Sequence, residues 1–164
     1  MFVIFTGTLR AQNHADTNLI VKTNWGLCFT KCSNWSITSN TNKNITLIQT
    51  TGQWSGDIMT IEYVSGDTIK DDSGKFGWIL YWHDEANKSW MKQFSDEEGL
   101  VPYITKPADT LGVLADGFPI FRGNGVWATL IIPLSNKTFL KCNVTGSGAT
   151  DPVFLLAGTI RKIK

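Results

Sequence analysis

The sequence has little net charge of either sign. Its 15 Lys and Arg residues nearly balance its 14 Asp and Glu residues, which leaves a formal net charge of +1 at pH 7. A protein that attracts nucleic acid or an anionic lipid surface through its overall field needs a clear excess of basic residues. The one concentrated basic stretch, RKIK at residues 161–164, is short. We therefore expect no nucleic acid among the partners of this chain.

Long apolar runs are also lacking. No stretch approaches the roughly 18 consecutive apolar residues of a membrane-spanning helix. The first ten residues, MFVIFTGTLR, have no basic lead, and their apolar run stops after Phe5. A secretory signal combines a positive flank with a longer apolar core. We expect no membrane insertion, and a chain that folds in the compartment where it is made.

Cysteine and histidine are scarce, at 3 and 2 residues. If Cys28 and Cys32 lie on one strand, their Cα atoms are roughly 13 Å apart at about 3.3 Å per residue. That separation exceeds the ~7 Å limit for a disulfide. Cys142 alternates with Leu140 and Val144, which indicates a small core residue. We expect reduced, buried thiols and, with so few ligands, no metal and no cofactor.

Aromatic residues and glycine are plentiful, with 7 Trp, 9 Phe and 15 Gly. Such residues favour strands and turns, and strand-like runs recur here between turn signals at short spacing. The pattern predicts an all-β fold, an antiparallel β-sandwich or barrel-like domain with long loops and at most a short helix. The length suits one domain over residues 1–164, within which an irregular, Pro-containing connection joins sub-regions 1–100 and 101–164.

Several segments carry turn or loop signals. The stretch 33–44, SNWSITSNTNKN, is too poor in apolar residues for a core strand. We expect DDSGK at 71–75 to be a loop, so that Asp71 and Asp72 are solvated. Residues 99–119 predict a long irregular connection with one helical turn at 111–115.

The last third of the chain predicts three further strands. The run GVWATLIIPL is apolar on both faces over residues 130–132, which is typical of a central strand, and Pro133 is expected to end its pairing. KTFLKCNVTG is the second predicted strand, rich in β-branched and aromatic residues. VFLLAGTIRKI at 153–163 is the third.

The segment WILYWHDEANKSWMKQF, residues 78–94, is ambiguous between a hairpin and a helix. Aromatic and aliphatic side chains alternate before and after DEANK, which is a suitable five-residue hairpin loop. A helix would also align residues 86, 90, 91 and 94, but it would place the acidic run 96–98 at its negative end. We predict the hairpin.

His83, Asp84 and Glu85 within this segment form the strongest candidate for catalysis. In a strand, His83 and Glu85 share a face and Asp84 points the other way. No nucleophile elbow, His-Glu-x-x-His helix or phosphate loop accompanies them. We therefore predict a solvated turn and no catalytic residues. A small hydrolase that uses His83 and nearby carboxylates stays as an alternative.

Two tryptophans stand in polar surroundings. Trp35 lies in SNWSITSN and Trp54 in GQWSGD. A tryptophan flanked by small polar residues offers a flat apolar face with a hydrogen-bonding rim, which suits sugar rings and protein partners. The candidate receptor- or glycan-binding residues are therefore Asn34, Trp35, Trp54 and Asp57. The alternative is that these tryptophans are loop anchors packed onto the sandwich.

The organisation of residues 15–95 resembles the knob and tip domains of bacteriophage fibres. Those domains commonly carry an Asp-x-Asn start, a glycine-aromatic turn and a closing strand with aromatic or basic residues. In this sequence Asp16, Asn18, Gly26 and Phe29 occupy the first part, and residues 90–94 occupy the last. The resemblance implies a non-enzymatic virion protein, often trimeric, that touches the host surface or decorates the capsid.

We therefore expect a virion structural or attachment protein, made in the host cytoplasm. Its expected partners are other virion proteins, a host surface glycan or protein, and further copies of itself in a homotrimer. A carbohydrate-binding module or lectin is the first alternative, because sugar stacking uses the same side chains. An interaction or inhibitor protein is indistinguishable from these on sequence.

Overall fold

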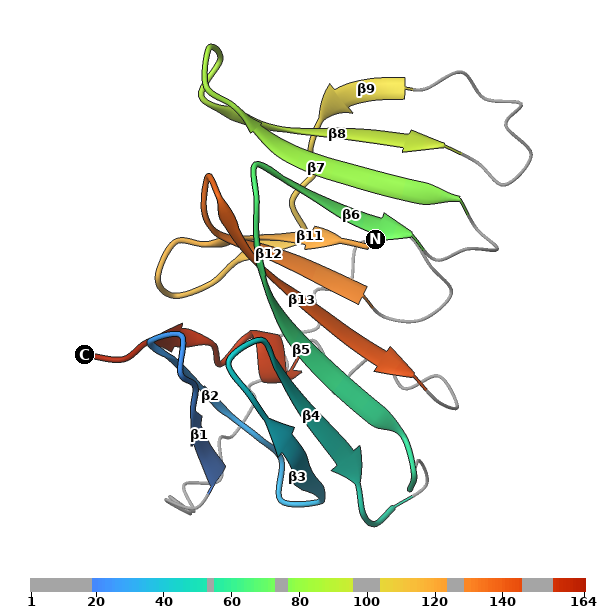
Figure 1. The fold of residues 1–164 in the computed structure, drawn as a ribbon, viewed down its shortest axis with the longest axis vertical. Helices are drawn as coiled ribbons and strands as arrows, with labels where there is room; N and C mark the ends of the chain where they lie inside the picture. The colour runs from blue at the N-terminus through green and yellow to red at the C-terminus, as the bar shows by residue number, and fades with distance from the viewer. Residues whose placement is uncertain (1–18, 53–54, 73–76, 96–103, 124–128, 146–154) are drawn as a thin grey trace, which may run out of the picture.

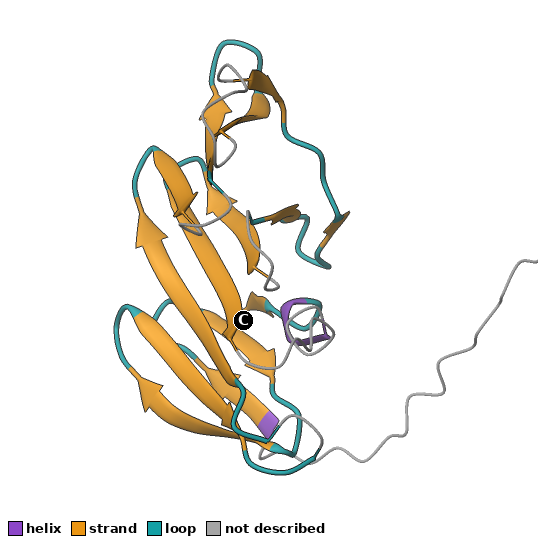
Figure 2. Ribbon diagram, turned by 90° about the vertical axis from the view of Figure 1, so that its right-hand side faces the viewer, coloured by secondary structure: helices purple, strands orange, loops and turns teal. Residues whose placement is uncertain are grey.

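The computed structural model of the chain describes residues 19–52, 55–72, 77–95, 104–123, 129–145 and 155–164. Over these residues the chain forms three antiparallel sheets and a short helical segment at residues 155–157. Figure 2 shows how strands dominate the molecule. The predicted all-β antiparallel fold with at most a short helix is confirmed. Among the described residues, no helix is long and apolar enough to cross a membrane.

The largest sheet has seven strands in the order β10-β11-β12-β13-β5-β4-β3 (Figure 1). In chain order these are β3 (Trp35–Asn40), β4 (Asn44–Gln49), β5 (Ile58–Ser65), β10 (Gly112–Val113), β11 (Pro119–Arg122), β12 (Thr129–Ser135) and β13 (Thr138–Thr145). β12 lies between β11 and β13, so the prediction of a central strand is confirmed. Pro133 does not end its pairing, because it still pairs with Phe139 and the register shifts only between Pro133 and Ser135.

The second sheet has four strands in the order β6-β7-β8-β9. They are β6 (Thr68–Asp72), β7 (Trp78–Asp84), β8 (Ser89–Ser95) and β9 (Ile104–Pro107). β7 and β8 pair from Trp78 with Ser95 to Asp84 with Ser89, which confirms the predicted hairpin. Lys88 closes the turn with a φ of 50°.

A small sheet with the order β1-β2-β14 completes the fold. Its strands are β1 (Ile20–Lys22), β2 (Leu27–Thr30) and β14 (Arg161–Lys162). The segment 153–163 is therefore not one long strand. Its residues 155–157 are helical and β14 is short, because Leu156, Ala157 and Ile160 turn inward to a core instead of alternating across a sheet.

The first hydrophobic core lies between the seven-stranded sheet and the small sheet. Leu27 and Phe29 of β2 enter it together, as their alternation in the sequence requires. The large sheet contributes alternate residues of its central strands, including Leu130, Ile132 and Leu140. Cys142 is fully buried there, which confirms its predicted core position. In Figure 2 the short helix packs on this same side of the large sheet.

A second core joins the opposite face of the large sheet to the four-stranded sheet. It contains Ile69, Ile79, Tyr81, Phe121, Ile131 and Phe139. Neighbouring residues of β12 therefore serve different cores, because successive side chains of a strand point to opposite faces. The central strands are covered on both faces, which explains why β12 is apolar from Leu130 to Leu134.

Polar contacts also join the two larger sheets. Lys141 of β13 places its Nζ 2.6 Å from Oδ1 of Asp71 on β6, and the Asp71 side chain is only 5% exposed. The Tyr81 hydroxyl donates to the carbonyl oxygen of Arg122 at 2.6 Å. Burial, followed by the nearby charges of Asp109 and Asp71, raises the pKa of Tyr81 above its ordinary value. The expectation that Asp71 lies in a solvated loop is wrong, because β6 extends through this residue to reach Lys141.

Two other loop predictions are also wrong. Within 33–44, residues 35–40 form β3, an edge strand that can be polar because its side chains after Trp35 are mostly exposed. Within 99–119, residues 104–107 form β9 and residues 112–113 form β10. The expected helical turn at 111–115 is not formed, because β10 is followed by a tight turn in which the backbone N–H of Gly117 donates to the carbonyl oxygen of Leu114 and Gly117 has a φ of 83°.

Candidate functional site

Two of the predicted binding residues, Trp35 and Asp57, are buried. Trp35 is 3% exposed and belongs to the first core, while Asp57 is 4% exposed. Asn34 is half-buried, and its carbonyl oxygen accepts hydrogen bonds from both the backbone and the hydroxyl of Thr50. Trp54 lies outside the described residues. The alternative, a loop anchor packed onto the sandwich, therefore applies to Trp35.

The reason lies in the position of Trp35 in β3. It is the first residue of the strand and pairs with Gln49, so its ring reaches inward at the end of the sheet. The residues that follow are mostly exposed, because β3 is an edge strand. The polar neighbours in the sequence reflect this exposed remainder of the strand and say nothing about the tryptophan ring itself.

The His83 segment is organised as a tight structural turn. Oδ1 of Asp84 accepts hydrogen bonds from the backbone of Ala86 and Asn87. Its Oδ2 accepts a third from the Asn87 side chain at 2.7 Å. These bonds, that of the Asn87 side chain foremost, lower the pKa of Asp84. The carboxylate is thus committed to closing the hairpin.

His83 and Glu85 do share a face, as predicted. His83 Nδ1 lies 3.2 Å from Glu85 Oε1, although the two atoms do not have hydrogen-bond geometry. The His83 ring is 14% exposed and meets Trp90 edge-on, with centroids 5.1 Å apart. Asn136, in the turn between β12 and β13, donates to the same Glu85 oxygen at 2.6 Å. The contact between Asn136 and Glu85 therefore links the β12–β13 turn to the β7–β8 turn.

Metal-ligand clusters are absent from the part of the chain that the structure describes. No group of three or more His, Cys, Asp or Glu residues there has an arrangement that could hold a metal ion. The three cysteines are free. Cys28 and Cys142 are buried as expected, whereas Cys32 is exposed because it lies beyond the end of β2.

A stacked aromatic pair is the best candidate for recognition. Trp25, in the turn between β1 and β2, stacks on Tyr63 of β5 with ring centroids 5.4 Å apart and an interplanar angle of 20°. Both rings are only partly buried and rest against the first core. The two residues are 38 positions apart in the sequence, so only the packing of the small sheet against β5 brings the rings together.

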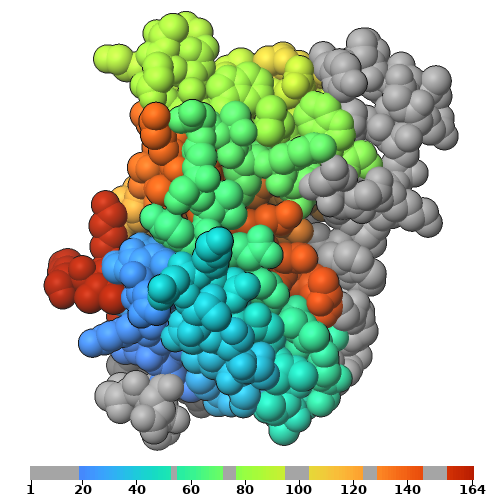
Figure 3. Space-filling model, viewed as in Figure 1, coloured from blue at the N-terminus to red at the C-terminus, as the bar shows by residue number. Residues whose placement is uncertain are grey.

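Hydrogen bonds fix the Trp25 ring in place. Its indole Nε1 donates to the carbonyl oxygen of Asn42 at 2.7 Å. The side chain of Asn24 donates to Oδ1 of Asn42 at 2.9 Å. These bonds tie the β1–β2 turn to the β3–β4 turn, whose segments lie side by side as blue and cyan surfaces in Figure 3. Gly26, with a φ of 74°, lets the chain turn directly after the tryptophan.

A pocket of about 500 Å³ opens beside the pair. It is lined by Asn42, Lys43, Tyr63, Val64 and Ser65. The pocket thus joins one side of an aromatic ring to an amide, an ammonium group and a hydroxyl. The ring of such a pocket stacks on a flat apolar face of a ligand, and the polar side chains form hydrogen bonds with the ligand groups around that face.

The sequence analysis singled out neither Trp25 nor Tyr63 and so missed this site. The usable signal was Asn24-Trp25-Gly26, in which turn formers surround the tryptophan just as polar residues surround Trp35. Comparisons of the chain with protein-family models, with curated proteins and with solved structures find no match.

Proposed function

We propose that this chain is a non-enzymatic attachment or structural protein of a virus particle, of the fibre-tip or decoration type, which acts by binding. Two observations support the proposal. Residues 15–95 resemble bacteriophage fibre knob and tip domains in their sequence organisation. The aromatic pair of Trp25 and Tyr63, with its amide-lined pocket, is a rigid surface suited to a glycan or protein receptor.

The observation that carries the proposal is the stacked pair. An aromatic ring held by a hydrogen bond and a second ring loses little conformational freedom when it binds. Trp25 is held in this way by Tyr63 and Asn42. Assembly with other copies would use the unpaired edges of the sheets, of which β3 and β10 end the large one.

A glycan array probed with labelled protein tests the recognition site. We expect Trp25→Ala and Tyr63→Ala to weaken binding to any bound glycan by about tenfold or more, since central aromatic contacts dominate such interfaces. Trp82→Ala is the matched control, because Trp82 is a half-buried tryptophan on β7 of the other sheet. Far-UV circular dichroism confirms that each variant is folded. Equal binding by all four proteins would remove the aromatic pair as the site.

The molar mass in solution separates the leading function from the lectin alternative. Light scattering of an attachment protein of this type is expected to give three times the mass of one chain, from a homotrimer. A monomer that binds glycans would favour a carbohydrate-binding module, whose aromatic stacking chemistry is the same. A monomer that binds neither glycans nor cell surfaces would contradict the attachment role.

A further inference from the structure

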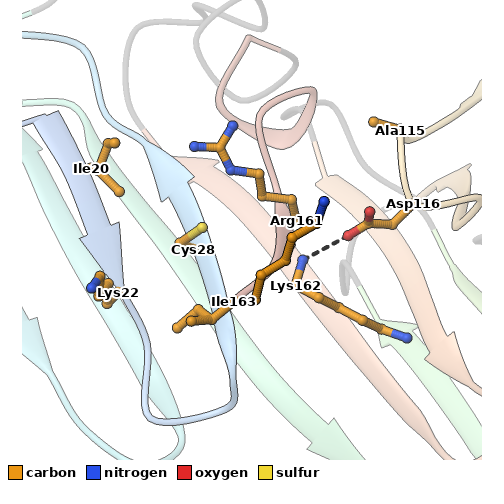
Figure 4. A pocket seen from close by; sticks show the side chains of 9 residues that line it. Ile20, Lys22, Cys28, Ala115, Asp116, Arg161, Lys162 and Ile163 are labelled. Atoms are coloured by element: carbon orange, nitrogen blue, oxygen red, sulfur yellow. Dashed lines mark hydrogen bonds between the residues drawn. The ribbon is translucent and has the colours of Figure 1, made fainter. Parts of the chain in front are cut away.

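A second pocket, of about 500 Å³, lies at the small sheet and is strongly basic. Figure 4 shows it between β1, β2, β14 and the turn that contains Asp116. Its lining residues are Ile20, Lys22, Cys28, Ala115, Asp116, Arg161, Lys162, Ile163 and Lys164. Four cationic residues and one acidic residue thus line the pocket, in a chain whose net charge is only +1.

The strand register aligns two of these cations on either side of a small residue. Lys22 of β1 pairs with Cys28 of β2, and Cys28 pairs on its other side with Arg161 of β14. Directly opposed residues of neighbouring strands point to the same face of a sheet. Figure 4 accordingly shows Cys28 between Lys22 and Arg161.

The spacing of this row suits an anion. Neighbouring Cα atoms in such pairs are about 5 Å apart, so the Cα atoms of Lys22 and Arg161 are about 10 Å apart. Long cationic side chains bridge that distance toward a group placed above the short cysteine side chain. An ammonium and a guanidinium together favour an oxyanion, which the guanidinium contacts with two parallel hydrogen bonds.

The described residues supply no acidic side chain that pairs with the two cations of the row, Lys22 and Arg161. Oδ2 of Asp116, the acidic residue of the pocket, accepts a hydrogen bond from the backbone N–H of Lys162 at 2.7 Å. Lys162 directs its Nζ toward the Phe118 ring, 5.1 Å from the centroid. Within the described part of the chain, the charge of the row is therefore available to a ligand.

An apolar rim accompanies the charge. Ile20 is 45% exposed and Ile163 is 39% exposed, and both line the pocket. Exposed aliphatic side chains next to paired cations suit a ligand that carries an anionic group on a short apolar part. From this combination we propose that the Lys22–Cys28–Arg161 row binds an organic phosphate monoester, with the phosphate over Cys28 and its substituent against Ile20 and Ile163.

The test is a titration of ¹⁵N-labelled full chain with n-butyl phosphate, inorganic phosphate and n-butanol at low salt. We expect saturable amide shifts confined to β1, β2 and β14 with butyl phosphate. Weaker binding of inorganic phosphate at the same residues would show the contribution of the apolar rim. Butanol is expected to give no saturable shift, because it lacks the charge.

Variants decide whether the row itself is responsible. Lys22→Gln and Arg161→Gln are each expected to raise the Kd about tenfold, the effect of losing one charge-assisted contact. Arg161→Lys retains the charge and should restore part of the affinity. The matched control is Lys88→Asn, which removes an exposed charge from the β7–β8 turn and tolerates the positive φ there. Its Kd should equal that of the wild type.

Several results would overturn the proposal: no saturable shift with either phosphate, shifts that map to other strands, or an equal loss of affinity in Lys88→Asn. The last would mean that overall charge alone attracts the anion. The site is separate from the aromatic pair of the proposed function. Because butyl phosphate has no ring to stack on Trp25, its binding can fail without affecting the glycan result, and the glycan result can fail without affecting the titration.

Discussion

Replacing Lys141 with methionine tests how the two larger sheets are held together. Lys141 Nζ lies 2.6 Å from Asp71 Oδ1, with side-chain exposures of 22% for Lys141 and 5% for Asp71. Methionine keeps much of the aliphatic stem and removes the charge. The variant therefore leaves the Asp71 carboxylate in its buried position without its lysine partner.

The expected loss lies between two limits. Removing one partner of a fully buried ion pair costs about 3–5 kcal/mol, whereas an exposed pair contributes about 0–1 kcal/mol. Since Asp71 is buried and Lys141 is partly solvated, we expect Lys141→Met to lower the free energy of unfolding by about 2–3 kcal/mol. At about 2–4 °C per kcal/mol for a chain of this size, the Tm falls by roughly 4–12 °C.

Urea unfolding followed by tryptophan fluorescence measures this loss, and a double-mutant cycle with Asp71→Asn isolates the pair. We expect a coupling energy of about 1–2 kcal/mol between the two sites. Lys137→Met is the control, because Lys137 and Asp67 form an ion pair at 3.2 Å with side-chain exposures of 77% and 81%. It should change stability by less than about 0.5 kcal/mol. Equal losses in the two lysine variants, or additive losses in the cycle, would refute the reasoning.

Three further predictions concern single positions. Gly123→Ala would place a methyl carbon 2.5 Å from a carboxylate oxygen of β6 and from a side-chain carbon of β12, so we expect about 1–3 kcal/mol of destabilisation in urea. A thiol reagent at pH 8 should modify exposed Cys32 well before Cys142, because burial raises the pKa of Cys142 to about 12; equal rates, measured by mass spectrometry, would contradict this burial. Asn87→Ala should raise the pKa of Asp84 toward its ordinary value, because it removes the largest cause of the lowering. In the wild type, the hydrogen bonds to ionised Asp84 stabilise the fold at neutral pH, and this contribution is lost as the pH falls through the lowered pKa. Carbon-detected NMR of the Asp84 carboxyl group can follow the titration in both proteins.

The sequence alone determined much of the fold, because period-two alternation is a local property. The alternation correctly predicts that Cys142 lies in a core, that β12 is a central strand and that residues 78–94 form a hairpin. It also put His83 and Glu85 on one face. In each case the relevant partners are near in sequence, or burial follows directly from the apolar pattern.

Burial of polar-flanked residues was decided by the tertiary structure. Polar or turn-forming residues flank both Trp25, which is partly exposed, and Trp35, which is buried. The sequence around Asp71 predicts a loop, but in the structure its carboxylate lies beside Lys141, which is 70 residues later in the chain. Local composition cannot distinguish these cases, because the neighbour that covers a side chain belongs to another strand.

Both candidate sites likewise depend on strands that are distant in the sequence. Tyr63 meets Trp25 across two sheets, and Arg161 joins Lys22 only because β14 returns to pair with β2. Sequence periodicity fixes which face of a strand is apolar, but it does not fix which strand lies next to it. The order of strands in a sheet is set by long-range packing, and that order is what created the aromatic pair and the cationic row.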